Sequence, residues 1–151
     1  MSAKTITFSL DKAKVLDTVY ALSAMRTYHR DAPRPLGRDE APALKRLMEA
    51  SAANVMTVLL PFVADAELHG SDAISMTLSV PEGVDVSAAQ QILMSVKMEE
   101  AVALGVLALA FETVCPAGSA AAARSSMAAA AEIAAVLDRP PEGLRLSPHP
   151  W

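Results

Sequence analysis

The sequence predicts an α+β fold that is mainly α: a four-helix domain with two short β-strands and an extended, proline-rich C-terminal tail. Three observations predict it. Residues 5–10 and 74–80 alternate apolar and polar side chains, which is typical of half-buried strands. Four long stretches rich in alanine carry apolar residues at helical spacing. The segment 139–151 contains four prolines, which exclude a helix there and favour an extended chain.

The length supports one domain, which we expect to span residues 1–138, followed by an extended arm over residues 139–151. A hydrophobic content of 52% and a charged content of 20% are typical of a globular protein. Aromatic residues make up only 4% of the chain. The core must therefore be closed by close approach of backbones rather than by large side chains.

The first half of the chain predicts two helices after the first strand. Helix one covers residues 11–29, with Ser9 or Asp11 as its N-cap. A loop with two prolines and a glycine follows over residues 30–38. Helix two covers residues 40–65, and Pro61 should kink or stop its last turn because proline removes a backbone hydrogen bond. Residues 67–72 form a polar turn that leads into the second strand.

The second half predicts a central helix and an alanine-rich partner. Ser87 with Gln90 is typical of a capping box at the start of helix three, residues 88–114, which is apolar nearly all round. Ser119 can cap helix four, residues 120–138. Ala101, Gly105 and Ala108 offer small side chains to the alanine blocks of helix four, so we expect these two helices to pack unusually close.

No set of residues predicts catalysis, a cofactor site or a metal site. The three histidines lie in separate segments, Cys115 is the single cysteine, and no glycine-rich phosphate loop is present. Asp65, Glu67, His69 and Asp72 are possible metal ligands by type, but such residues are typical of any exposed turn. We therefore expect a protein that is not an enzyme, with no cofactor and no small-molecule substrate.

Charge and hydropathy indicate where the protein works. A net charge of −4 argues against a nucleic-acid partner. A single cysteine excludes an internal disulfide and favours a reducing, cytoplasmic setting. The first five residues contain no apolar segment, so we expect no signal peptide. The longest apolar run, residues 101–111, falls short of the roughly 20 residues that span a bilayer, so we expect no membrane contact.

Two groups of residues are candidates for a protein interface. The first is the basic segment around Arg26, Arg30, Arg34 and Arg38, which could dock an acidic partner, although a solvated loop is the simpler interpretation. The second is the tail, with Leu144, Leu146 and the single tryptophan, Trp151. These apolar residues follow every predicted helix, and tryptophan is enriched in interface hot spots. The tail could lie on its own domain or on a neighbouring copy, and the sequence leaves both open.

The order of elements resembles small uncharacterised virion-type proteins of Bacteroidales prophages. A short strand precedes a helix containing residues 16–25 and a second helix containing residues 44–51; an alternating strand, two more helices and a tail from Arg139-Pro140-Pro141 follow. The resemblance implies a non-catalytic structural subunit near the head–tail junction or in the tail of a particle. It would act through homo-oligomers and other particle proteins, in the host cytoplasm and in the virion.

Two other classes of function stay open on the residues alone. One is a small adaptor or regulatory helical domain that binds a protein partner. The other is an enzyme or ligand-binding protein whose site is assembled from scattered residues.

Overall fold

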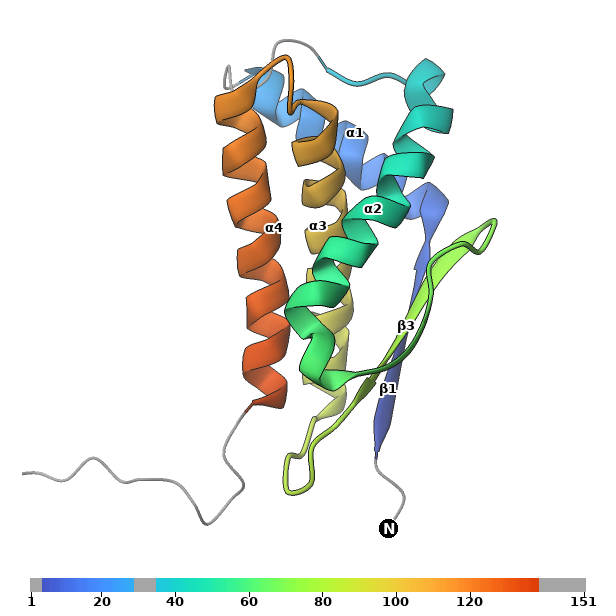
Figure 1. Cartoon of the computed structure of the whole chain (residues 1–151), viewed down its shortest axis with the longest axis vertical. Coiled ribbons are helices and arrows are strands. Elements are labelled where there is room, and N and C mark those ends of the chain that lie inside the picture. Colours follow the sequence, from blue (N-terminus) through green and yellow to red (C-terminus); the bar gives the residue numbers. More distant parts are fainter. Residues whose placement is uncertain (1–3, 29–34, 139–151) are drawn as a thin grey trace, which may run out of the picture.

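The computed structural model describes residues 4–28 and 35–138, and it shows a small antiparallel sheet with helices packed on one of its faces (Figure 1). The elements in chain order are β1 (Thr5–Asp11), α1 (Lys12–Tyr28), the 3-10 turn η1 (Arg38–Glu40), α2 (Ala41–Leu59), the 3-10 turn η2 (Leu60–Phe62), β2 (Val63–Glu67), β3 (Ala73–Ser79), α3 (Ala88–Ala110) and α4 (Pro116–Leu137). The predicted fold class, α+β and mainly α with four helices, is confirmed. The predicted arm, residues 139–151, lies outside the described residues.

The two strands predicted from alternation, β1 and β3, pair with each other in antiparallel register, with Thr7 opposite Thr77. On each strand every second side chain is buried, and on β1 these are Ile6, Phe8 and Leu10. The side chains between them are polar, and the hydroxyls of Thr7 and Thr77 lie 3.0 Å apart on the open face. The alternation therefore separates a helix-covered face from a polar one, as expected for a sheet with one solvated side.

The prediction of two strands is wrong by one, because a third strand, β2, pairs with the other side of β3 in the order β1-β3-β2. The sequence predicted helix two as far as residue 65. Instead α2 ends at Leu59, the 3-10 turn containing Pro61 follows, and the chain becomes extended at Val63. The predicted stop at Pro61 is thus confirmed. A register shift between Val63 and Asp65 interrupts the alternation of β2, which explains why the pattern does not predict it.

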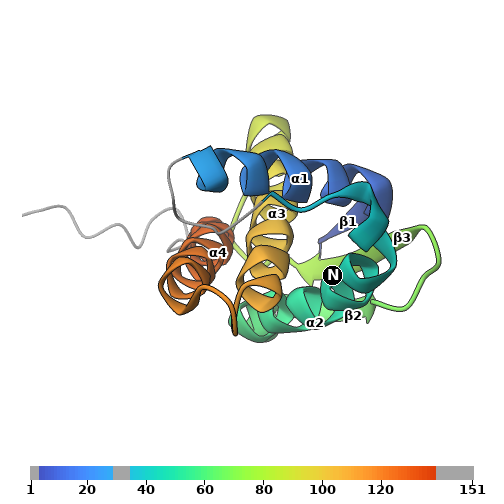
Figure 2. The same ribbon diagram turned by 90° about the horizontal axis from the view of Figure 1, so that it is seen from above.

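Helix α3 is the centre of the helical layer and packs against α1, α2 and α4 (Figures 1 and 2). The capping box at its start is confirmed: the Gln90 amide donates to Ser87 Oγ (3.1 Å), and the Ser87 amide donates to Gln90 Oε1 (2.8 Å). Two helix boundaries differ from the prediction. Helix α3 ends at Ala110 rather than 114, and α4 begins at Pro116, which suits the first helical position because proline has no amide proton to satisfy. Ser119 is not the cap of α4; its hydroxyl donates to the Ala108 carbonyl (2.6 Å).

Two buried serines join α3 to its neighbours on either side. Ser51 of α2 donates to the carbonyl of Val102 (2.7 Å), and Ser126 of α4 donates to the carbonyl of Ala101 (2.6 Å). A side chain as short as serine reaches a neighbouring backbone only when the helices lie close together. Gly105 makes this approach possible, but its nearest neighbour is Ser51 on α2 rather than the alanine blocks of α4 that the sequence suggested.

Candidate protein-interaction surface

The predicted basic segment is only partly described. Arg26 lies half-buried in the last turn of α1, and Arg38 is exposed at the start of η1. Arg30 and Arg34 lie outside the described residues. The chain returns to α1 after this gap, because the Leu36 amide donates to the buried hydroxyl of Ser23 (2.6 Å). The structure therefore anchors both ends of the segment, and the docking role of its arginines stays a prediction.

The predicted tail residues, Leu144, Leu146 and Trp151, also lie outside the described residues. Their point of departure is described: α4 ends at Leu137, at the same end of the molecule as the start of α3 (Figure 1). The tail therefore starts from this end of the molecule towards any surface that it contacts.

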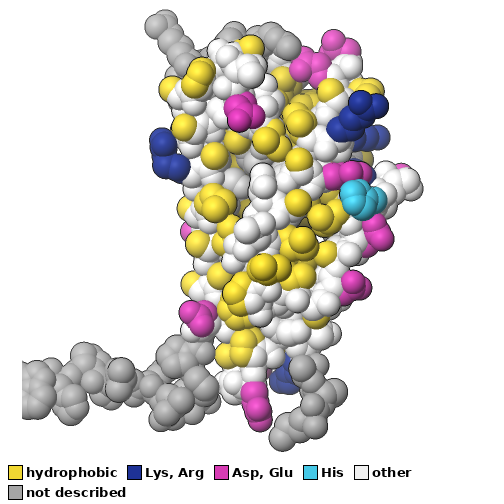
Figure 3. Space-filling model, viewed as in Figure 1, with side chains coloured by type: hydrophobic (Ala, Val, Ile, Leu, Met, Phe, Trp, Pro, Cys, Tyr) yellow, Lys and Arg dark blue, Asp and Glu magenta, His cyan; other side chains and the backbone are white. Residues whose placement is uncertain are grey.

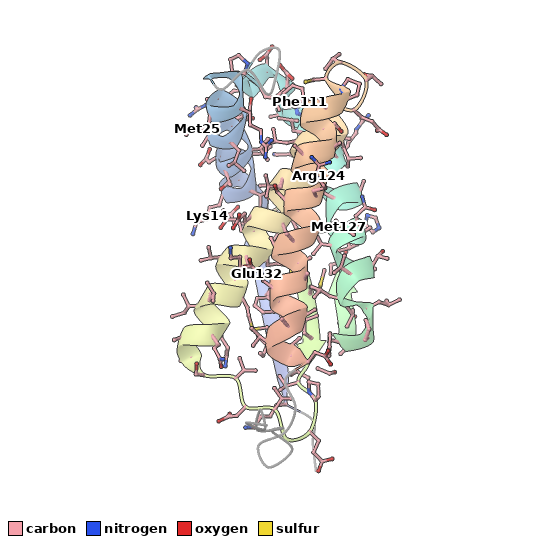
Figure 4. The ribbon with its side chains drawn as sticks, turned by 90° about the vertical axis from the view of Figure 1, so that its left-hand side faces the viewer. Lys14, Met25, Phe111, Arg124, Met127 and Glu132 are labelled. Atoms are coloured by element: carbon pink, nitrogen blue, oxygen red, sulfur yellow. The ribbon has the colours of Figure 1, made fainter. Side chains whose placement is uncertain are left out.

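An apolar patch that the sequence does not predict lies on the first turns of α3. Ile92, Leu93 and Val96 are 68%, 52% and 54% exposed, although the same helix is buried from Ala101 onward. Figure 4 shows why: the N-terminal half of α3 leans away from α4 and projects past the rest of the helical layer. The all-round apolarity of this helix indicated burial, whereas these three side chains on its first turns are more than half exposed. We call Ile92, Leu93 and Val96 the α3 patch.

A second apolar region covers much of the face formed by α2 and α4, with most charged side chains near its margins (Figure 3). Its large exposed side chains include Leu60 (60%), just after α2, and Met127 (52%) on α4. They stand on different elements, and much of the exposed surface of α4 between its charges is alanine. The α3 patch is therefore the denser group of large apolar side chains.

The free edge of β1 lies beside Val96, one residue of the α3 patch. The Lys12 amide donates to the Asp72 carbonyl (2.9 Å) and the Val80 amide donates to the Lys4 carbonyl (2.8 Å), so the even-numbered residues of β1 make the backbone hydrogen bonds to β3. In an antiparallel ladder the alternate residues, here Thr5, Thr7 and Ser9, direct their backbone groups away from the partner strand. Within residues 4–28 and 35–138 nothing pairs with these outward groups, which we call the β1 edge.

The two edges of the sheet differ in how well they are protected. The other edge strand, β2, is five residues long, carries a bulge and holds Asp65 and Glu67; short length, bulges and charges discourage the pairing of a further strand. Strand β1 has seven residues in regular register, and no proline or charge precedes its last residue. The β1 edge is therefore the one open to another strand.

A shallow groove of about 190 Å³ separates the β1 edge from α3. Ser9, Leu10 and Asp11 of β1, Lys14 and Val15 of α1, and Ser95, Val96 and Glu99 of α3 line it. It has an edge strand on one side and a helix on the other, which is the arrangement that accepts an extended peptide by strand addition. Its lining combines three apolar side chains, Leu10, Val15 and Val96, with three charged ones.

The described charged groups act as links between elements. Lys97 of α3 lies 3.1 Å from Glu132 of α4 and 3.5 Å from Glu100, and the hydrogen bond to Glu132 together with the charge of Glu100 raises the pKa of Lys97. Lys97 therefore joins α3 to α4 through Glu132. Glu99 accepts a hydrogen bond from Thr18 of α1 (3.0 Å).

The polar group near the β2–β3 turn is also held by local contacts. Glu49 of α2 lies 3.8 Å from the buried Lys12 ammonium and 3.0 Å from His69 Nδ1, and the His69 amide donates to Glu67 (2.9 Å). Asp65, predicted at the end of helix two, and Glu67, predicted at the start of the turn, both stand in β2. In the part of the chain that the structure describes, no group of three or more His, Cys, Asp or Glu could hold a metal ion. Cys115 is half-buried at the start of α4.

Comparison with known proteins gives no match: no family model matches the chain, and no curated protein or solved structure is significantly similar to it.

Among the described residues one helix, α4, is long and apolar enough to cross a membrane by length and composition alone, and 33% of its apolar window is buried in the protein. Core helices of soluble proteins also pass this criterion, so the absence of membrane contact stays a prediction.

Proposed function

We propose that this chain is a non-catalytic assembly subunit that binds further copies of itself. The observation that carries the proposal is the α3 patch: Ile92, Leu93 and Val96 stand more than half exposed on adjacent turns of the helix that forms the core. Covering what remains exposed of each side chain contributes on the order of 1 kcal/mol to association. Exposed groups of this kind mark protein-interaction sites.

Two different surfaces on one chain favour contacts between copies. The α3 patch and β1 edge form one surface, and the apolar residues Leu144, Leu146 and Trp151 of the arm form another. Contacts between unlike surfaces are head-to-tail, and they either close into rings or propagate. A subunit of a ring or tube needs this geometry and needs no catalytic residue.

The more specific form of the proposal is a head–tail connector or tail-completion protein of a phage or phage-like particle, found in the virion and the host cytoplasm. It is supported by the order of elements and by the suitability of head-to-tail contacts for a ring. Mass spectrometry of purified particles from the producing cells would detect the chain if this form holds. If the chain assembles but no purified particle contains it, the subunit proposal stands and the connector form of the proposal is wrong.

The mass of the full chain in solution tests the proposal. Light scattering over a range of protein concentrations at low salt should show oligomers, and deletion of residues 139–151 should reduce them while circular dichroism stays nearly unchanged. Leu93→Asp should weaken assembly. Met127→Asp is the matched control, because Met127 is equally exposed (52%) but lies on α4. A full-length chain that stays monomeric at high concentration would refute self-assembly and favour the adaptor or regulatory domain.

A further inference from the structure

We propose that residues 142–147 from the arm of one copy add to the β1 edge of a neighbouring copy as a fourth strand, with Leu144 and Leu146 covering the α3 patch. This inference rests on the proposed function and specifies the contact through which the copies bind.

The receiving surface supplies both parts of a strand-addition site. The outward backbone groups of Thr5, Thr7 and Ser9 provide hydrogen-bond donors and acceptors along seven regular residues. The groove beyond them is lined by Leu10, Val15 and Val96, with the charged side chains of Asp11, Lys14 and Glu99 beside them. An added strand would therefore have its backbone paired on one side, and its inward side chains would meet Leu10 and Val96 within a lining that also carries charge.

The arm contains one segment that fits this surface. Residues 142–147, with the sequence Glu-Gly-Leu-Arg-Leu-Ser, form its longest run without proline, so each of them can donate a backbone hydrogen bond. In an extended chain Leu144 and Leu146 point to one side while Arg145 and Ser147 point to the other. The leucines then face the α3 patch, and the polar pair joins the polar face that Thr7 and Ser9 already form.

The structure favours a neighbouring copy over the arm's own domain. Helix α4, from which the arm departs, and strand β1 lie on opposite sides of α3 (Figures 1 and 2). Six Cα–Cα steps lead from Asp138 to Leu144, through two prolines, and they span at most about 20–22 Å. Passing one helix with its side chains takes about 10–12 Å of that length. An arm that passes α3 to the β1 edge of its own molecule would use about half of its length on the way, whereas a second copy can present its edge directly to the arm; docking of the arm on its own domain is the outcome in which the unaltered chain stays monomeric.

Two variants of the full chain break the contact from the receiving side. Thr7→Pro removes an outward amide that no described residue uses, and proline is tolerated on edge strands when its position faces outward. Val96→Asp places a charge in the groove at a site that is already 54% exposed. Each should weaken self-association about tenfold or more, which corresponds to a loss of about 1.4 kcal/mol or more. Circular dichroism establishes whether each variant is folded. If Thr7→Pro does not fold, Val96→Asp alone tests the receiving side.

The matched controls lie on the other edge of the sheet, strand β2, and on helix α4. The even-numbered residues of β3 make their backbone hydrogen bonds to β1, so the odd-numbered ones, opposite Asp65 and Glu67, make theirs to β2. The amide of Ala66, between Asp65 and Glu67, therefore points outward from the other edge. Ala66→Pro and Met127→Asp should leave self-association within a factor of two of the unaltered chain.

A mixing experiment tests the exchange itself. One full chain carries Val96→Asp with an intact arm, and the other carries Leu144→Asp and Leu146→Asp with an intact edge. Each alone should be monomeric, and the equimolar mixture should form a dimer by light scattering. Trp151, the single tryptophan, reports the arm: its emission should shift to shorter wavelength in the mixture when only the Val96→Asp chain carries tryptophan.

The outcomes separate this inference from the proposed function. If the unaltered chain assembles but the edge and arm variants assemble equally well, the subunit proposal stands and the strand exchange is wrong. If the mixture of variants stays monomeric, the arm does not reach a neighbour's edge, and the inference is wrong again. If the unaltered chain is itself monomeric, the proposed function fails, and the exchange fails with it.

Discussion

Replacement of Gly105 by alanine should destabilise the protein, although alanine is the better helix former. A Cβ atom at Gly105 would overlap Ser51 Oγ, lie 3.1 Å from Ser51 Cβ and lie 3.4 Å from Ser126 Oγ. The Ser51 hydroxyl must then leave its hydrogen bond to the Val102 carbonyl, in a site with no access to solvent.

The magnitudes of the opposing effects decide whether Gly105→Ala raises or lowers the free energy of unfolding. Alanine gains about 1 kcal/mol over glycine within a helix. A buried hydroxyl without its partner costs about 1–3 kcal/mol, and the crowding of a packed interface costs about 1–3 kcal/mol. The net loss in the free energy of unfolding is about 1–5 kcal/mol. For a chain of this size each kcal/mol lowers the melting temperature by about 2–4 °C.

Urea denaturation of Gly105→Ala, Ser51→Ala and the double variant measures these effects, at one protein concentration because assembly contributes to stability. Ser51→Ala alone should cost about 0.5–1.5 kcal/mol. The double variant should lose less than the sum of the two single variants, because it has no hydroxyl to displace. A Gly105→Ala protein that is as stable as the unaltered chain, or losses that simply add, would refute the close contact between α2 and α3.

Three further predictions follow from the described contacts. Ser126→Ala should cost about 1 kcal/mol in thermal or urea unfolding, whereas Ser125→Ala, on the exposed neighbouring position, should change stability little; equal effects would contradict the hydrogen bond between α4 and α3. Ser87→Ala should lower stability by about 0.5–2 kcal/mol through loss of the N-cap of α3, and an unchanged melting temperature would contradict the capping box. Glu132→Gln should lower the pKa of Lys97 toward its ordinary value in an NMR titration; because that pKa is raised in the folded protein, the stabilisation is present at neutral pH and is lost as pH rises through the raised pKa. An unchanged titration would mean that Glu132 does not bind Lys97 in solution.

The features that the sequence predicts well are those set by nearby residues. The strict alternation of β1 and β3 identifies both strands, because every second side chain is buried on one face. Ser87 and Gln90 identify the start of α3, since the two residues bind each other across one turn. Pro61 identifies the end of α2, because the missing amide and the fixed ring act within four residues.

The features that it does not predict depend on segments far apart in the chain. Strand β2 is short and bulged, so its extended conformation depends on pairing with β3. The α3 patch is exposed because α4 diverges from the first turns of α3, and an apolar helix surface looks the same in the sequence whether a neighbour covers it or not. Gly105 was correctly identified as a point of close approach, but its partner on α2 depends on how the helices are aligned.

The placement of β3 at the centre of the sheet has a consequence for the order of folding. Helices α3 and α4 follow each other after a short connection, so their contacts are local and form with little loss of chain entropy. Strand β1 must instead find a partner 70 residues away, with Thr7 opposite Thr77, and closing so long a loop is slow. We expect the helical hairpin to protect its amides early in pulsed hydrogen exchange and β1 to be the last strand protected. Until β1 arrives, one side of β3 stays open, and during synthesis this interval leaves the nascent sheet exposed to other chains.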